Sequence, residues 1–345
     1  MIRDLILVLL MLTVITSVHE AGHMLAARAF GVGVKEYAIG IGPAIFKHKA
    51  GNTIYSLRML PLGGFCRIKD LDEEDNDEVP GACLHRLAFW KRALVALAGP
   101  FSNLVLAFAV CALTLLIYGY YPARITSVQA DGPSFDILQE GDLILSIDGH
   151  RTRLLEDARE RIAASGSDTV TVRFLRDGKQ MTASIKPRET ESGRKLGIIF
   201  TLEKKRCGPL ELVPCGLEKT ASQAGYIISA LRDAVLGRKK LQLAGIVGVA
   251  SEVGTVIDAA SSPRGISVAE LLLTVLSLLS LNIGLINLMP LPAMDGGRTL
   301  FAIAEGITGK DLHMQEAAAA AVSILPIAAI FLYTFYSDFI NYIWR

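Results

Sequence analysis

Two histidines and a glutamate lie inside the first apolar stretch of the chain, at His19, Glu20 and His23. Positions four apart in a helix differ by about 40° around the axis, so both imidazoles can bind one metal ion. The carboxylate, about 100° from His19, then flanks the open coordination position. This spacing is typical of zinc hydrolases, in which the glutamate is the general base. The alternatives are a chance match and a pair of core histidines in a soluble helix.

The stretch from Leu5 to Ala27 contains no other ionisable side chain. Polar groups are costly in hydrocarbon unless they face a protein interior or a cavity, so we interpret the cluster as a functional site. A cleaved signal peptide is a further alternative, because Arg3 and the small residues near Ala27 imitate one. The apolar core of a signal peptide is roughly 7 to 15 residues long, whereas this run has 23 residues.

The composition is typical of a membrane protein, because 51% of the 345 residues are hydrophobic and only 20% are charged. A helix needs about 20 apolar residues to cross a bilayer. Stretches of that length occur at 5–27, 93–123, 271–294 and 317–337. We therefore predict a multi-pass α-helical membrane protein with four transmembrane helices. The connection 28–92 carries ten Lys and Arg, which predicts that it is cytoplasmic and that the termini and segment 124–270 lie outside.

Asp295 is the candidate third metal ligand, since a catalytic zinc usually keeps three protein ligands and one open position. It closes the third apolar run, after two prolines and before a glycine pair that break a helix. Broken helices are tolerated inside a membrane only where the backbone lines protein or water. The first and third helices cross in the same direction, so we expect His19, His23 and Asp295 to meet toward the cytoplasmic side. The alternative is a helix-ending carboxylate at the interface.

These motifs resemble those of the site-2 protease family of intramembrane zinc metalloproteases, in particular bacterial members with one PDZ domain between the second and third crossings. The first family motif corresponds to the histidine and glutamate cluster. The second corresponds to residues 287–297, which contain Asp295. Residues 98–103 are similar to a signature of small residues, proline and asparagine in the second helix.

The resemblance implies that Zn²⁺ is the cofactor and that the two histidines and Asp295 bind it. It implies that Glu20 is the general base and then the proton donor to the leaving amine. Asn287 and Asn103 would hold the substrate backbone or the oxyanion. The alternative for both amides is a hydrogen bond to a neighbouring helix carbonyl.

Residues 34–69 predict a β-hairpin, because glycines and prolines punctuate short β-prone pieces such as 53–57. The family has a membrane re-entrant β-hairpin here, which the resemblance implies pairs with unwound substrate as an added strand. An ordinary cytoplasmic loop is the alternative. The acidic run 70–78 is interpreted as a solvated linker.

Residues 123–204 predict a separate α+β domain, with a helix at 154–164 and a hairpin turn at Asp177 and Gly178. The order of elements resembles an extracytoplasmic PDZ insert in the circularly permuted bacterial form, with residues 196–200 in its peptide groove. A PDZ body that only excludes bulky substrates is the alternative. The predicted strands are 124–128, 143–147, 169–174 and 181–185.

Residues 216–240 predict an amphipathic helix on the membrane surface. At Ile246 the family usually has proline, and this chain departs from that pattern. The 243–257 stretch is shorter than the about 20 residues of a crossing, so we do not count it as a fifth one. Cys207 and Cys215 can form a disulfide if their compartment oxidises thiols, but spacing alone does not show that the sulfurs meet.

The sequence therefore predicts seven segments. They are the first transmembrane helix with the zinc motif (1–33), the re-entrant hairpin and cytoplasmic loop (34–92), the second helix (93–122), the PDZ domain (123–204), an extracytoplasmic juxtamembrane segment (205–269), the third helix with the third ligand (270–297), and the fourth helix with the C-terminus (298–345).

We expect an intramembrane metalloendopeptidase in a bacterial cell membrane, with its active site toward the cytoplasm. Its partners would be a transmembrane protein or peptide substrate, a peptide in the PDZ groove, and membrane lipid. The resemblance suggests trimmed anti-sigma factors or remnant signal peptides as substrates. Nucleotide and nucleic-acid partners are not expected, since the net charge is +1 and no phosphate-binding glycine loop occurs. The alternatives are a catalytically inactive zinc-containing PDZ scaffold, a metal transporter, and a tethered protease with a soluble catalytic domain.

Overall fold

The computed structural model divides the chain into two compact units. Unit 1 comprises Met1–Ala107 and Ile227–Arg345, and unit 2 comprises Phe108–Tyr226. The boundaries fall within two long helices, α2 (Phe89–Tyr118) and α4 (Pro209–Val235). The acidic run 70–78, the basic end 238–240 of the predicted amphipathic helix and residues 243–245 lie outside the described residues. The structure describes residues 2–69, 80–166, 168–190, 193–201, 203–236, 246–260, 267–338 and 340.

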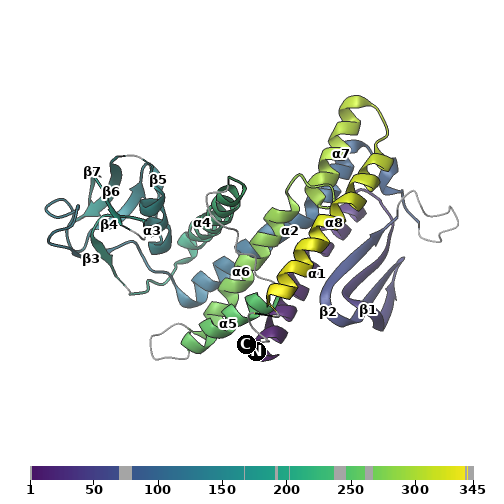
Figure 1. The fold of residues 1–345 in the computed structure, drawn as a ribbon, viewed down its shortest axis with the longest axis horizontal. Helices are drawn as coiled ribbons and strands as arrows, with labels where there is room; N and C mark the ends of the chain where they lie inside the picture. Colours follow the sequence, from purple (N-terminus) through teal and green to yellow (C-terminus); the bar gives the residue numbers. More distant parts are fainter. Residues whose placement is uncertain are drawn as a thin grey trace. The chain divides into compact units, whose positions relative to one another are not determined.

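Long apolar helices form the body of unit 1 (Figure 1). Three helices in the described part of the chain are long and apolar enough to cross a membrane: α1 (Ile2–Ala29), α2 and α6 (Val268–Asn287). The predicted fourth apolar stretch forms α8 (His313–Asp338), and its role as a crossing stays a prediction.

A shorter helix, α5 (Ile246–Ala260), packs against the start of α1. Val8 of α1 lies in one apolar cluster with Ala250, Val253 and Ile257 of α5. Ile246 is the first residue of α5, and the family usually has proline at this position. Proline is common at the first position of a helix, and other residues also fit there. The departure from the family pattern is therefore compatible with this helix.

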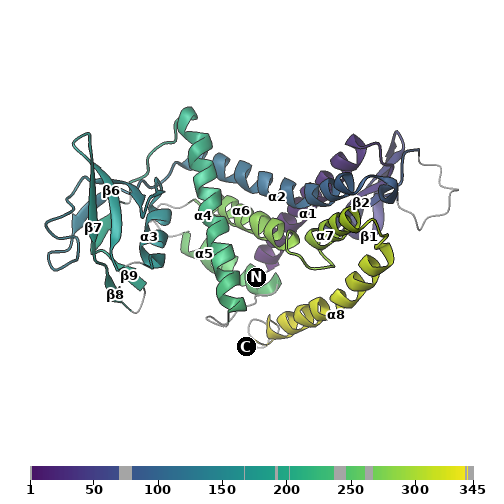
Figure 2. The same ribbon diagram turned by 90° about the horizontal axis from the view of Figure 1, so that it is seen from above.

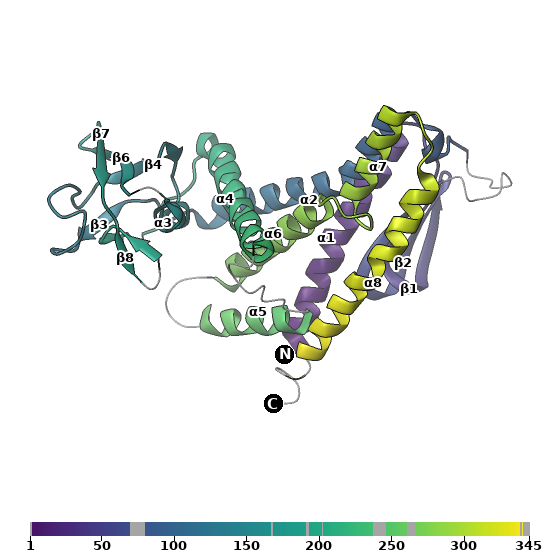
Figure 3. The same ribbon diagram turned by 45° about the horizontal axis from the view of Figure 1, so that its top comes forward.

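The predicted hairpin is present as β1 (Val34–Ala50) and β2 (Thr53–Ile68), which pair antiparallel around a turn with Gly51 at φ +60°. It lies along α1 (Figure 3). The Tyr37 hydroxyl donates a hydrogen bond of 2.7 Å to the carbonyl of Ser17. The hairpin is thus attached to the helix that carries both histidines.

The third apolar run is broken, as two prolines in it require. α6 ends at Asn287, and a new helix, α7 (Asp295–Thr308), begins at Asp295. The break expected at the prolines and the glycine pair is therefore present, and Asp295 opens α7, a helix that was not predicted. A Cβ at Gly297 would lie 2.1 Å from the carbonyl oxygen of Leu291, so only glycine lets the connecting turn pack this closely on α7.

Unit 2 contains an α+β domain built on a four-stranded antiparallel sheet of order β5-β4-β6-β7. The helix α3 lies beside the sheet (Figure 2). Its apolar side chains belong to a core that includes Phe174 of β6. The strands β3 and β10 pair with each other, as do β8 and β9. The elements are β3 (Ile125–Val128), β4 (Leu143–Ile147), β5 (His150–Arg151), α3 (Leu155–Ala164), β6 (Val170–Arg176), β7 (Lys179–Ile185), β8 (Arg188–Thr190), β9 (Gly193–Lys195) and β10 (Ile198–Phe200).

The four strands and the helix predicted for this domain are all present, with ends shifted by a few residues at most. Asp177 and Gly178 form the turn between β6 and β7 at φ +48° and +79°, as expected for a two-residue hairpin. The predicted groove segment 196–200 contains β10. The amphipathic helix begins earlier than expected, at Pro209, as α4.

Cys207 and Cys215 are both free and buried in one apolar cluster of unit 2. Burial and the neighbouring Cys215 thiol raise the pKa of Cys207 to about 11, so this sulfur is protonated at neutral pH. A disulfide between Cys207 and Cys215 stays a prediction.

Candidate metal centre

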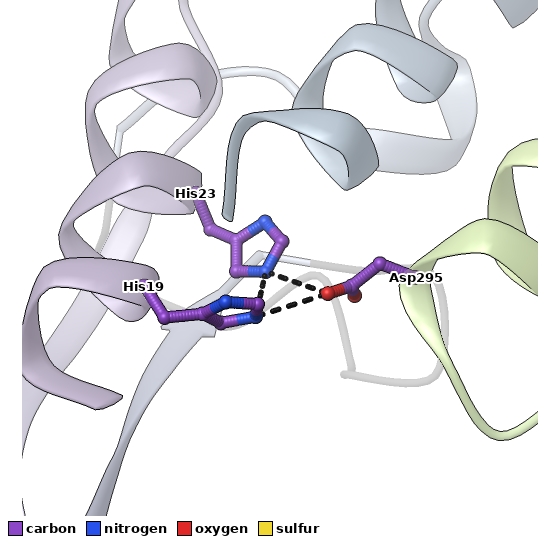
Figure 4. A group of neighbouring side chains, drawn as sticks. All are labelled: His19, His23 and Asp295. Carbon is purple, nitrogen blue, oxygen red and sulfur yellow. Dashed lines mark hydrogen bonds and ion pairs between the residues drawn. The ribbon is translucent and has the colours of Figure 1, made fainter. Parts of the chain in front are cut away.

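Three side chains from distant parts of the chain converge on one point (Figure 4). Nε2 of His19 lies 3.0 Å from Oδ2 of Asp295 and 3.2 Å from Nε2 of His23. Nε2 of His23 lies 3.4 Å from the same carboxylate oxygen. The histidines come from successive turns of α1, and Asp295 is the first residue of α7. The structure thus brings together all three predicted ligands.

The spacing of the three donor atoms fits a tetrahedral zinc ion. With zinc–ligand distances of about 2.0–2.1 Å, tetrahedral ligands lie about 3.3 Å apart, close to the three separations found here. All three residues are at most 9% exposed. A buried carboxylate facing two imidazoles needs a positive charge for compensation, which a divalent cation provides.

Both imidazole rings are held by contacts at the nitrogen that faces away from the donor cluster. Nδ1 of His23 lies 2.8 Å from the carbonyl oxygen of Val95, so Nδ1 carries the proton and Nε2 presents a lone pair. Nδ1 of His19 lies 3.3 Å from the side-chain amide of Asn103. Each ring therefore directs Nε2 toward the common point.

Glycine at position 99 of α2 leaves the space that the metal requires. A Cβ there would lie 2.2 Å from Nε2 of His23 and 2.8 Å from Nε2 of His19. On α1, a Cβ at Gly22 would lie 2.3 Å from the carbonyl oxygen of Ala98, so α1 and α2 are in backbone contact beside the site. Side chains at either glycine are incompatible with this arrangement.

Glu20 lies beside the donor cluster and contacts the hairpin. Its Oε2 accepts a hydrogen bond of 2.9 Å from the backbone N–H of Cys66 in β2. Glu20 and the three donor residues line one cavity of about 270 Å³. The carboxylate is thus oriented by the backbone of a strand that is itself attached to α1.

The cavity also has polar walls that the sequence motifs did not indicate. His85 and Arg92 line it from one side, and Arg92 is paired with Glu305. Arg298 of α7 lines it too, with its Nε 3.8 Å from the carboxylate of Glu316. A polar cavity of this kind can admit water to the donor cluster.

The two predicted asparagines occupy different positions. Asn287 lines the cavity, and its amide donates to the carbonyl oxygen of Ile283 at 2.9 Å. Asn103 is 0% exposed and does not line the cavity, and its amide faces His19. Asn103 therefore faces a candidate zinc ligand, and its expected contact with the substrate stays a prediction.

The sequence motifs did not reveal the roles of Gly99, of the Val95 carbonyl or of the Cys66 backbone N–H. Gly99 belongs to the 98–103 stretch, whose similarity to the family signature does not indicate what the glycine does. Backbone groups carry no residue-specific signal, so no sequence pattern identifies them.

A buried donor set of this kind, in helices apolar enough to cross a bilayer, defines a membrane-embedded metal hydrolase. Residues 7–332 match peptidase family M50, and the chain therefore belongs to that family. It is a zinc metalloprotease of the site-2 protease type, and Zn²⁺ is its cofactor. The resemblance found in the sequence is confirmed.

Similar proteins occur in several bacteria. A candidate zinc metalloprotease of Mesorhizobium japonicum is 31% identical, over 96% of both chains. One of Clostridium perfringens is 32% identical, over 89% of this chain and 90% of its own. The zinc metalloprotease RasP of Geobacillus kaustophilus is 26% identical, over 86% and 88%. Among solved structures, the PDZ domain of the SdrC-like protein from Listeria innocua covers 25% of this chain and 98% of its own, with 28% identity and a TM-score of 0.22.

Replacing Gly99 by alanine is expected to abolish stoichiometric zinc binding, because the new methyl group would occupy the space between the two imidazole nitrogens. Zinc content of the purified full chain can be measured by inductively coupled plasma mass spectrometry. Gly225→Ala on α4, where an added Cβ meets nothing within 4 Å, is the matched control and should retain zinc. Equal zinc content in the two variants would contradict this account of the site.

Proposed function

We propose that this metalloprotease hydrolyses a peptide bond within or next to a transmembrane segment of a membrane protein. The observation that carries the proposal is the position of the donor cluster, buried between helices that are long and apolar enough to cross a bilayer. A substrate for such a site has to reach it through the membrane.

We assign His19, His23 and Asp295 as the zinc ligands. When bound, zinc acts as a Lewis acid that polarises a peptide carbonyl and makes a water molecule acidic enough to attack near neutral pH. The ring contacts at Nδ1 and the close approach of α1 to α2 hold the two imidazoles in place.

Glu20 is the proposed general base. Its carboxylate shares the cavity with the donor cluster, where it can take a proton from the attacking water and return it to the leaving amine. The Cys66 N–H holds one carboxylate oxygen, which leaves the other oxygen for this proton transfer. A protein that only stored zinc or bound a partner would not need this group.

Asn287 is the proposed contact to the substrate backbone. It ends α6 and lines the cavity, and only one of its two amide hydrogens is used for the Ile283 carbonyl. The second hydrogen and the amide oxygen are then available for a peptide group in the cavity.

Asn103 is proposed as a positioning residue for a zinc ligand. Its Oδ1 is buried without a hydrogen-bond partner, while its Nδ2 faces Nδ1 of His19. Oxygen and nitrogen of a side-chain amide are assigned from their partners. With the amide turned over, Oδ1 accepts from the His19 Nδ1–H, and this tautomer leaves Nε2 free for zinc.

The hairpin is the proposed template for an unwound substrate. A helical substrate hides its peptide bonds in internal hydrogen bonds and has to open before cleavage. Residues 36–39 of β1 pair with 54–57 on one side and with 64–67 on the other, so in the described part of the chain the outer edges of this sheet are 44–50 and 60–68, where an extended peptide can pair. Because Cys66 of β2 contacts Glu20, a strand added here would be directed to the site.

We further propose four crossings, with α8 as the fourth, in a bacterial cell membrane. The ten Lys and Arg of residues 28–92 favour a cytoplasmic location of this connection, and with it of the zinc site. The α+β domain of unit 2 would then be extracytoplasmic and act as a PDZ domain that binds a peptide or excludes bulky substrates. Substrates of this topology include anti-sigma factors already trimmed by another protease and remnant signal peptides.

Glu20→Gln is expected to retain zinc and to lower cleavage of a model transmembrane substrate by at least about 10²-fold, the usual contribution of a general base. The assay uses the full chain reconstituted in lipid, with Glu140→Gln on the surface of unit 2 as the matched carboxylate-to-amide control. Cleavage by the Glu20 variant at the wild-type rate would disprove the assignment. Loss of its zinc would instead indicate that Glu20 is a ligand.

Asn103→Ala is expected to weaken zinc affinity by about 10- to 100-fold, as for other residues that hold a metal-bound histidine. Asn103→Asp keeps an acceptor for the His19 Nδ1–H and should stay near the wild-type affinity. Competition with a fluorescent chelator measures both, and circular dichroism checks the helix content. If alanine and aspartate have the same effect, the residue does not act through His19.

A further inference from the structure

Unit 2 contains a second cavity, formed by residues of this unit alone, with a volume of about 580 Å³. It is bounded by Tyr120, by residues of β4 and β5, by the segment after β10 and by the first turns of α4. It shares no lining residue with the zinc cavity. Its volume is in the range of small-molecule sites. We call it the basic cavity.

The walls of the basic cavity carry more positive than negative charge. Five cationic side chains line it, against the carboxylates of Glu203 and Glu211. Lys205 pairs with Glu211 at 3.0 Å, and Nε of Arg153 lies 3.8 Å from the nearby Glu218. When the carboxylates of Glu203, Glu211 and Glu218 are all counted against the five cations, the net charge is still +2. The cationic residues are Arg124, Arg151, Arg153, Lys204 and Lys205.

A buried hydroxyl without a partner also lies in this wall. Thr152 lines the basic cavity between Arg151 and Arg153, and it is 0% exposed. Its Oγ1 has no hydrogen-bond partner, although its backbone N–H donates to the carbonyl oxygen of Leu145. Buried polar groups in folded proteins are normally satisfied, so this hydroxyl is available to donate to an acceptor oxygen in the cavity.

The basic cavity adjoins the end of a membrane-spanning helix. Tyr120 lines it, only two residues after α2 ends at Tyr118. The ammonium of Lys204 lies over the rings of Tyr118 and Tyr121, at 5.9 and 5.3 Å. Tyrosines and long cationic side chains in such positions are typical of the level of lipid headgroups.

One face of α4 beside the basic cavity is apolar and open. Leu210, Val213 and Leu217 recur at helical spacing and are 94%, 56% and 55% exposed. A helix with such a face is suited to lie in the membrane interface. An anion in the cavity would therefore be flanked by surfaces that contact acyl chains.

We propose that the basic cavity binds the phosphate-bearing headgroup of an anionic phospholipid. The cations attract the phosphate, the Thr152 hydroxyl donates to one of its oxygens, and the apolar face of α4 contacts the acyl chains. Free phosphate shares the headgroup chemistry but would not use the apolar face. This inference is independent of the proposed protease function.

The test is lipid binding to the full chain in detergent, measured by native mass spectrometry with phosphatidylglycerol, phosphatidylcholine or inorganic phosphate as the probe. Phosphatidylglycerol should bind in preference to both other probes. Arg151→Gln should weaken its binding about fivefold, the usual effect of one interfacial charge. Thr152→Val, which has nearly the same volume, should weaken it about tenfold through the lost hydrogen bond to a charged group.

Two controls keep the test decisive. Arg173→Gln, on an exposed position of β6 outside the cavity, removes the same charge from unit 2 and should leave lipid binding unchanged. Thr152→Val should keep or raise the melting temperature without lipid, because it removes an unsatisfied buried hydroxyl. Equal binding of the two lipids, equal effects of the Arg151 and Arg173 variants, or binding of inorganic phosphate as tight as that of the lipid would each overturn the proposal.

Discussion

The structure depends on one electrostatic constraint, the convergence of a buried carboxylate and two buried imidazoles among apolar helices. Separations of 3.0 to 3.4 Å between the donor atoms of His19, His23 and Asp295 fit one zinc ion among them, whose charge would stabilise the buried carboxylate. The surrounding elements satisfy this constraint. Glycines at 22 and 99 let α1 and α2 approach with room for the ion, and the break after Asn287 brings the start of α7 to the same depth.

The same constraint explains why irregular backbone occurs in the apolar part of the chain. A continuous helix through 270–297 would keep its peptide groups bonded internally and would present Asp295 wherever the helix period placed it. The prolines end α6, and the glycine pair lets the following turn pack on α7. The hairpin is likewise attached to α1, where its backbone holds Glu20. Irregular segments of this kind are stable in a membrane where they line a cavity.

Much of this arrangement could be predicted from the sequence because its signals are local. The spacing of His19 and His23, the alternation in β6 and the Asp177–Gly178 turn each depend on neighbouring residues. Asp295 was identified from helix direction and motif context. The contact of Asn103 with His19 and the space at Gly99 were not predicted, because they arise where α1, α2 and α6 meet. The break after the third apolar run was predicted from its prolines and glycine pair, but α7, which begins at Asp295, was not predicted, since apolar composition continues through the turn.

The central claim is that two histidines and one carboxylate bind a single zinc ion between these helices. Zinc K-edge X-ray absorption of the purified full chain in detergent measures the ligands directly. The account predicts one zinc per chain with two imidazole nitrogens and two oxygens at about 2.0–2.1 Å and no sulfur. A sulfur ligand at about 2.3 Å, which would indicate cysteine coordination, or an absence of bound zinc would contradict it.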